Sequence, residues 1–176
     1  MKYVPYSKLA GVPNIIVDGA AQEHTVLTLS HWPGSGAPAE FQADTSTEIV
    51  LNYLATPGAA KKYAPRVRAV SNNHFDEDGL CSLWCMLHPE QALAQRDLLI
   101  DVATAGDFDN YRRPQAAKVV FIIRSYAEPA SSPVANKLKG DDGSGSSRYK
   151  ALLPLLGDFL EDTDHYGPWW DLEWSI

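Results

Sequence analysis

The stretch Ser-Asn-Asn-His-Phe-Asp-Glu-Asp-Gly-Leu-Cys-Ser at residues 71–82 decides how the fold and the site are interpreted. It places His74, Asp76 and Asp78 at every second position. Because side chains on an extended segment repeat their direction every two residues, these three should converge on one side of the backbone. An imidazole with two carboxylates suits a divalent cation such as manganese, magnesium or iron. We therefore expect a metal site here.

The same stretch fits a simpler interpretation, an acidic turn that caps a helix, because carboxylates favour helix N-termini. The residues that follow support a helix, since apolar side chains recur at intervals of three and four residues. These positions are Leu80, Leu83, Trp84 and Leu87. Both interpretations stay open at this point.

Polar residues follow three short apolar runs that are typical of strands. The predicted strands are Asn14–Val17, His24–Ser30 and Val67–Val70. Asp18 follows the first strand, His31 the second, and the 71–82 stretch the third. In open α/β sheets, ligands lie outside the carboxyl ends of the strands. We therefore expect Asp18, His31 and His74 at one edge of the sheet.

Helical signals separate and follow these strands. Thr45 and Glu48 fit a capping box, which predicts a helix that runs to about Leu54. Further helices are predicted at Pro89 to about Arg96, Leu98–Ala105, Pro114–Ala127, and Arg148–Asp162 with a break near Pro154. The apolar run Val119–Ile123 also fits a buried strand, but the length of the segment from Pro114 favours a helix. Strands that alternate with helices predict an α/β fold, here a Rossmann-like three-layer domain with a mostly parallel sheet and a helical C-terminal half.

The length of 176 residues favours one domain, residues 1–176. Within it we expect a core at residues 14–109 and a helical part at residues 110–165. A Ser- and Gly-rich stretch at residues 131–147 indicates a mobile surface loop. A Trp-rich tail occupies residues 166–176.

Composition limits the classes of partner. The 45% hydrophobic and 21% charged residues are ordinary for a globular protein. The net charge of -7 argues against double-stranded nucleic acid as a partner, but allows a small phosphorylated substrate held by a metal.

The cysteine pattern and the apolar runs bear on localisation. Cys81 and Cys85 have the spacing of one helix face, which disfavours a disulfide and indicates an intracellular protein. The N-terminal residues lack a signal-peptide core, and no run reaches membrane-spanning length, so we expect a cytoplasmic protein with no membrane partner. A zinc site from Cys81, Cys85, His88 and His74 is an alternative.

The motif His-x-Asp-x-Asp-Gly-x-x-Ser at residues 74–82 resembles the first motif of the DHH phosphoesterase superfamily. Ile15-Ile16-Val17-Asp18 is similar to the second motif of that family. Residues 29–34, followed by residues 45–50, are similar to its namesake motif and the helix after it. Asp107 resembles the aspartate of the fourth motif.

The resemblance implies a hydrolase of phosphoesters or phosphoanhydrides that depends on manganese or magnesium. It implies catalytic roles for His31, Asp76 and Asp78, and substrate contacts from His31 and Ser82. The implied metal ligands are Asp18, His74, Asp76, Asp78 and Asp107.

The chain also departs from the family pattern. Ser30 and Trp32 stand where the family has an aspartate and a second histidine. The second-like and third-like motifs precede the first-like one, so the order is permuted. No separate substrate-binding domain is evident.

Two other functions remain open. Asp76-Glu77-Asp78-Gly79 resembles the first motif of haloacid dehalogenase-like phosphatases, with Lys137 or Lys139 and Asp141-Asp142 as later motifs. Alternatively, the chain is a non-catalytic binding module whose residues 169–174 dock a partner or form a homo-oligomer. The clustered polar residues favour an enzyme.

Overall fold

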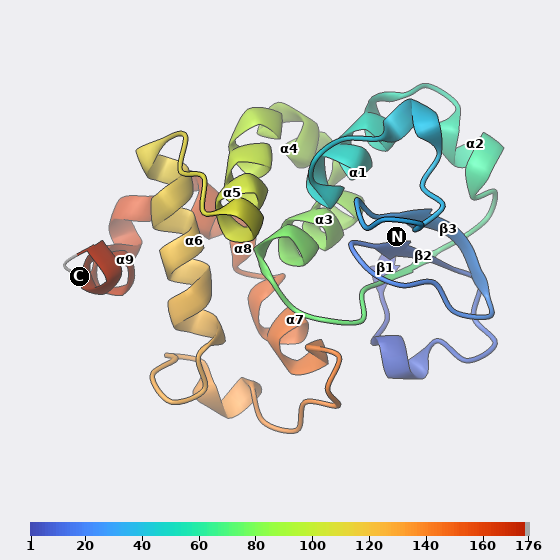
Figure 1. The fold of residues 1–176 in the computed structure, drawn as a ribbon. Helices are drawn as coiled ribbons and strands as arrows, with labels where there is room; N and C mark the ends of the chain where they lie inside the picture. The colour runs from blue at the N-terminus through green and yellow to red at the C-terminus, as the bar shows by residue number, and fades with distance from the viewer. Residues whose placement is uncertain (175–176) are drawn as a thin grey trace.

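The fold is built on a parallel sheet. The computed structural model describes residues 1–174, with side chains described through residue 171. Its strands are β1 (Lys2–Tyr3), β2 (Asn14–Val17), β3 (Thr25–Leu29) and β4 (Ala69–Ser71). They form a four-stranded sheet in the order β1-β4-β2-β3, and every pairing in it is parallel (Figure 1). The predicted α/β class with a parallel sheet is confirmed.

The second strand explains why the sheet lies inside the molecule. All four residues of β2 are buried. Ile15 and Val17 belong to the main hydrophobic cluster, and Ile16, which points to the other face, is equally buried. Both faces of this strand are therefore covered, as parallel sheets generally require.

The helices follow the strands and extend the core away from the sheet. They are α1 (Ser46–Ala55), α2 (Ala59–Tyr63), α3 (Glu77–Leu87), α4 (Pro89–Ala94), α5 (Arg96–Phe108), α6 (Pro114–Ala127), α7 (Ser146–Leu152), α8 (Leu156–Glu161) and α9 (Gly167–Trp174). Short 3₁₀ turns lie at Tyr6–Lys8, Ala39–Phe41, Ala135–Lys137 and Thr163–Tyr166. Helices α1 and α3 contact the sheet, whereas α5, α6 and α9 stack successively beyond α3 (Figure 1). One hydrophobic cluster runs from Ile15 to Leu160 and joins both halves.

Several predicted boundaries are confirmed. The strand Asn14–Val17 and the helix Pro114–Ala127 occur as expected. Helix α1 begins after Thr45, whose side chain accepts a hydrogen bond from the Glu48 amide at 3.3 Å. The side chain therefore satisfies one free amide of the first turn.

Two parts of the chain differ from expectation. Strand β1 was not predicted, because two residues carry no readable alternation. The stretch 131–147 has internal order. Leu138 is buried in it, and Asp141 and Asp142 accept hydrogen bonds from the amides of Gly143 and Ser144. Helix α7 begins inside this stretch, at Ser146.

The C-terminal helix packs on its own chain. Ser125 of α6 donates to the carbonyl of Trp169 at 2.8 Å, and the Lys118 ammonium lies 4.2 Å from the centre of the Trp170 ring. Trp169 and Trp170 are half-buried. Docking of a partner through residues 169–174 stays a prediction. The Trp174 side chain and residues 175–176 lie outside the described part (Figure 1).

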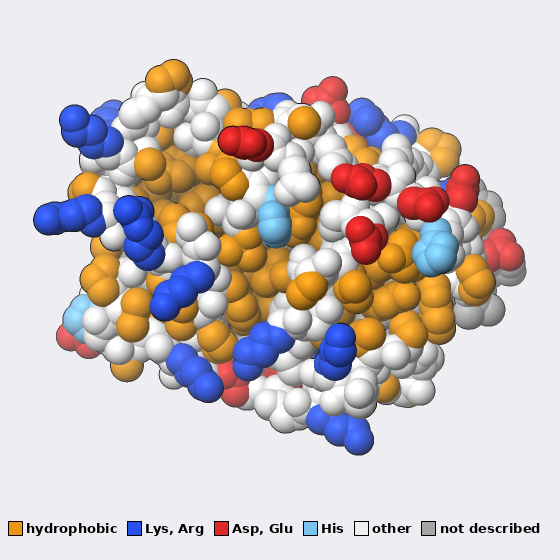
Figure 2. Space-filling view, turned by 180° about the vertical axis from the view of Figure 1, so that it is seen from behind, with side chains coloured by type: hydrophobic (Ala, Val, Ile, Leu, Met, Phe, Trp, Pro, Cys, Tyr) orange, Lys and Arg blue, Asp and Glu red, His pale blue; other side chains and the backbone are white. Residues whose placement is uncertain are grey.

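Charge is unevenly spread over the surface. Viewed from behind, Lys and Arg side chains gather mostly over the half that carries the sheet, and Asp and Glu mostly over the half with the C-terminal helices (Figure 2). The net charge of -7 is therefore not evenly distributed over the surface. Among the residues described, no helix is long and apolar enough to span a bilayer.

Candidate metal centre

The sheet brings the predicted residues to one edge. Asp18 directly follows β2, His31 lies two residues after β3, and His74 lies three residues after β4. Asp18 has a left-handed backbone with φ 46°, a conformation that aspartate tolerates better than most residues. These three side chains meet because the carboxyl ends of parallel strands lie together.

The Asp18 carboxylate stands between the two histidines. Its Oδ2 atom lies 3.3 Å from His74 Nε2, and its Oδ1 atom lies 3.7 Å from His31 Nε2. Asp76 Oδ2 lies 2.7 Å from His74 Nε2. Asp18 is only 1% exposed, whereas the side chains of His74 and Asp76 are each 32% exposed, so the site is open to water on the His74 side.

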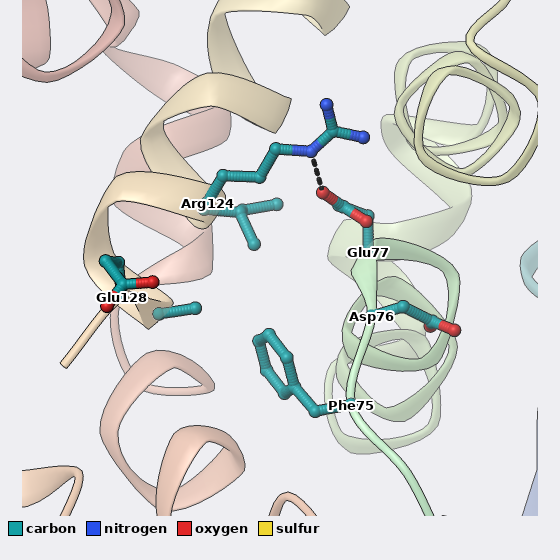
Figure 3. Close-up of a pocket in the computed structure, with 7 residues that line it drawn as sticks. Phe75, Asp76, Glu77, Arg124 and Glu128 are labelled. Carbon is teal, nitrogen blue, oxygen red and sulfur yellow. Dashed lines mark hydrogen bonds and ion pairs between the residues drawn. The ribbon is translucent and has the colours of Figure 1, made fainter.

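Asp76 has two tasks, which reconciles the two interpretations of its stretch. Its Oδ1 accepts the Gly79 amide at 2.7 Å and caps α3, while Oδ2 faces His74. Phe75 and Asp76 point to opposite sides of the chain, Phe75 toward α6 (Figure 3). On that far side a pocket of about 310 Å³ lies beside the Glu77–Arg124 ion pair, whose atoms are 2.7 Å apart.

Asp78 is held by a different helix. Because α3 starts at Glu77, Asp78 does not continue the extended segment that the sequence suggested. Its two carboxylate oxygens accept the amides of Ser46 and Thr47, each at 2.7 Å. These are orphan amides of the first turn of α1, so Asp78 fastens the N-terminus of α1 to the site.

Ser46 and Asn72 belong to the site but were missed from sequence. The Ser46 hydroxyl donates to Asp18 Oδ1 at 2.8 Å and accepts the His31 amide at 3.0 Å. Asn72 Nδ2 donates to Asp18 Oδ2 at 3.4 Å. A capping-box serine and an asparagine between a strand and a motif carry no specific signal of such contacts.

The His31 side of the site is arranged for proton chemistry. His31 Nδ1 lies 2.8 Å from the Asp44 carbonyl, which can only accept, so this nitrogen carries the proton. The Nε2 atom faces Asp18 and Asp107, whose Oδ2 is 3.5 Å away. That Oδ2 atom is buried and, among the residues described, has no hydrogen-bond partner.

Burial and crowding raise the pKa of three carboxyls. Burial raises the pKa of Asp18 to about 7, with the charges of Asp78 and Asp76 adding to the rise and the His74 hydrogen bond opposing it. Burial, then the charges of Asp78, Asp76 and Asp18, raise the pKa of Asp107 to about 8. Burial also raises the pKa of Asp78.

The ion pair with His74 works in the other direction. Burial alone would lower the pKa of His74, but hydrogen bonds with Asp18 and Asp76 raise it to about 10. Burial opposes the ionised form of Asp76, yet the hydrogen bond with His74 leaves its pKa below the usual value. The site thus retains protons near neutral pH, and a divalent cation could take their place.

Two sets of side chains could hold an ion. Asp18, His74 and Asp76 form one set, and Asp18, His31 and Asp78 form the other. Within each set the ligand atoms lie within 4.8 Å of one another. The donors are carboxylate oxygens and imidazole nitrogens, which fit manganese or magnesium. Asp107 reaches His31 but belongs to neither set.

Gly79 is required by space rather than by backbone conformation. A Cβ atom built at Gly79 would lie 3.1 Å from Asp18 Oδ2, and closer still to the side chains of Asn72 and Tyr149. Tyr149 donates its hydroxyl to the His74 carbonyl at 2.5 Å. The glycine therefore lets α3 approach the carboxylate that both sets share.

Ser82 does not reach the open side of the site. Its side chain is fully buried, and its hydroxyl lies 3.2 Å from that of Thr47 and 3.5 Å from Asp78 Oδ1. The expected substrate contact from Ser82 is therefore wrong; this residue supports Asp78 from behind.

The residues of the alternative functions lie in other settings. Asp141 and Asp142 accept hydrogen bonds from Ser147 and Ser146, so both carboxylates are engaged within their own loop. Cys81 and Cys85 are free and fully buried in the core, and burial raises both thiol pKa values.

Comparison with known proteins gives a family. A family model described as a family of unknown function, DUF6687, matches residues 1–175. No curated protein and no solved structure matches the chain.

Proposed function

We propose that this chain, which belongs to the DUF6687 family, is a divergent DHH-like, metal-dependent hydrolase of phosphoesters or phosphoanhydrides. One observation carries the proposal: Asp18 is shared by two sets of ligand atoms at the carboxyl edge of a parallel sheet. A cytoplasmic location is part of the proposal, because the free cysteines fit a reducing compartment.

We assign the ion to the set formed by Asp18, His74 and Asp76. In the other set, Asp78 already accepts two backbone amides at 2.7 Å, which leaves less of its carboxylate for a cation. Manganese or magnesium bound there would supply an acidified water and positive charge for the phosphoryl oxygens.

The His31 side handles the proton. His31 Nε2 and Asp107 Oδ2, 3.5 Å apart, can hold one proton between them. The Asp44 carbonyl holds the proton on Nδ1 in place, so the proton that can be transferred lies at Nε2, toward Asp107. We assign the protonation of the leaving-group oxygen to this pair.

The experiment combines metal analysis with turnover. Purified protein is loaded with manganese, measured by elemental analysis, and assayed on bis(p-nitrophenyl) phosphate and on pyrophosphate. We expect one bound ion and hydrolysis that chelator abolishes and manganese restores. Absence of both binding and hydrolysis would refute the proposal. Two ions per chain would make His31 a ligand instead of a proton carrier.

A matched pair of variants tests the assignment of the proton. Asp107→Asn removes the carboxyl beside His31, whereas Asp109→Asn alters an exposed aspartate two residues away. Both keep an acceptable residue at their positions, since asparagine tolerates the left-handed φ of 49° at residue 109. Only Asp107→Asn should lower turnover.

A further inference from the structure

A pocket opens beside the His31 side of the site. It has a volume of about 330 Å³, within the lower range of small-molecule pockets. Its lining includes Asp44, Ile100, Thr104, Phe108, Asn110 and Arg112. Two of these touch His31: the Asp44 carbonyl lies 2.8 Å from Nδ1, and the Phe108 ring meets the imidazole edge-on at 6.3 Å. The pocket therefore lies next to His31, separated from the imidazole by Asp44 and Phe108.

Phe108 is the most exposed large hydrophobic side chain at this edge, at 53%. It ends α5, directly after Asp107. An aromatic ring left in water beside a buried polar site offers a stacking surface for a flat ligand group. Ile100, half-buried on the same helix, adds apolar surface to the pocket.

The polar groups of the pocket differ in kind. Arg112 can only donate hydrogen bonds, the carboxylates of Asp44 and Glu48 accept them, and the amide of Asn110 does both. The Asn110 side chain has no hydrogen-bond partner among the residues described. A purely apolar or purely anionic group would leave part of this lining unmatched. A flat ring with donors and acceptors along its edge, such as a nucleobase, matches all of it.

We propose that this pocket holds the base of a nucleoside monophosphate whose phosphoryl group lies at Asp18, His74 and Asp76. The inference rests on the proposed function and names its substrate class. In the reaction, a water oxygen bonds to phosphorus, the P–O5′ bond breaks, and the His31–Asp107 pair gives its proton to O5′. The proton that the attacking water releases returns to this pair. The products are inorganic phosphate and a nucleoside.

The test compares adenosine 5′-monophosphate with ribose 5-phosphate, which has the same scissile bond and no base. Phosphate release in manganese gives the ratio of kcat/KM for the two compounds. We expect the ratio to exceed roughly 10, and Phe108→Ala to lower it by roughly tenfold through KM, because base stacking contributes about that much. Phe108→Tyr should retain it.

Tyr111→Ala is the matched control, since Tyr111 is 41% exposed in the same loop but does not line the pocket. It should leave the ratio unchanged. Equal losses for both compounds in Phe108→Ala, or a ratio near 1 in the wild type, would overturn the inference. So would loss of the ratio in Trp32→Ala, which would put the base beside His74 instead.

Binding separates this inference from the proposed function. Calorimetry with manganese-loaded protein measures the affinity for adenosine 5′-monophosphate and for ribose 5-phosphate without turnover. Tighter binding of the nucleotide by roughly tenfold, lost in Phe108→Ala, supports the pocket even if neither compound is hydrolysed. Equal affinities would overturn it, whatever the hydrolytic activity.

Discussion

The two sides of Asp18 are organised in opposite ways. On the His74 side the ligands hold one another, since His74 Nε2 lies 2.7 Å from Asp76 and 3.3 Å from Asp18. On the His31 side the backbone holds them, through the Asp44 carbonyl and the Ser46 amide. A side chain held by another ionisable group must release a proton to bind a cation, whereas one fixed by backbone keeps its orientation. The difference supports the proposed assignment of the cation to the His74 side and of the transferable proton to the His31 side.

The largest effect is expected where the two sides meet. Asp18→Asn removes the carboxylate common to both, so turnover should fall by roughly 1,000-fold or more, the scale of several kcal/mol of lost charge stabilisation. Elemental analysis should show loss of manganese, and circular dichroism should show a retained fold. Full activity in this variant would disprove that the two sides share a function.

Kinetic measurements should then distinguish the role of His74 from that of His31. His74→Ala should raise the manganese concentration needed for half-maximal activity, with turnover partly recovered at high manganese. His31→Ala should lower turnover by about 100-fold at saturating manganese, the usual contribution of a positioned acid or base. A manganese titration of both variants decides this, and identical profiles would contradict the division of roles.

Stability should distinguish Asp78 from Asp76. Asparagine at residue 76 can still cap α3, so Asp76→Asn should lose only the half-exposed ion pair with His74 and should lower stability less than Asp78→Asn does. Asp78→Asn places an amide NH₂ against one of the two backbone donors, with a loss of about 2 kcal/mol and a fall in Tm of roughly 4–8 °C. Thermal unfolding without metal measures both; equal Tm shifts would mean that Asp78 does not fasten α1.

The smallest effect is the pH dependence of the metal-free protein. The folded pKa values of Asp18 and Asp107, about 7 and 8, lie above the ordinary 3.8. The native state therefore holds more protons than the unfolded chain between about pH 4 and 8. The contribution of these two groups to the free energy of unfolding is fully present below pH 4 and is lost by pH 8.

The pKa of His74 is raised from 6.5 to about 10, so its contribution to stability declines between pH 6.5 and pH 10. The Tm of metal-free protein should thus fall from pH 6 to 9, and less steeply in Asp107→Asn. Manganese should reverse the trend, because its ligands bind it deprotonated. A rising Tm without metal would contradict the raised values.

The sequence predicted the elements whose signals are local. The capping residue Thr45, the β-branched strand Asn14–Val17 and the start of α6 at Pro114 each depend on neighbouring residues, and each was placed correctly. The meeting of Asp18, His31 and His74 followed from one rule about parallel strands. Strand β1 could not be read, because only its pairing with β4 defines it.

The remaining site contacts depend on packing between distant segments. Ser46 and Asp78 are 32 residues apart, and no pattern in either segment shows that an α1 amide needs a carboxylate from α3. For the same reason Ser82 matched a motif but lies behind Asp78. Side-chain chemistry can be listed from a sequence, whereas the direction in which each group is used requires the fold.

The glycine at residue 79 limits how this protein can evolve. Its missing Cβ atom leaves the space that Asn72, Tyr149 and the Asp18 carboxylate occupy. Even alanine would have to push these groups apart, so several compensating changes would be needed at once. Random mutagenesis with selection for folded protein should therefore find position 79 nearly invariant, while Gly34, with nothing within 4 Å of its Cβ position, is restricted only by its φ of 76°.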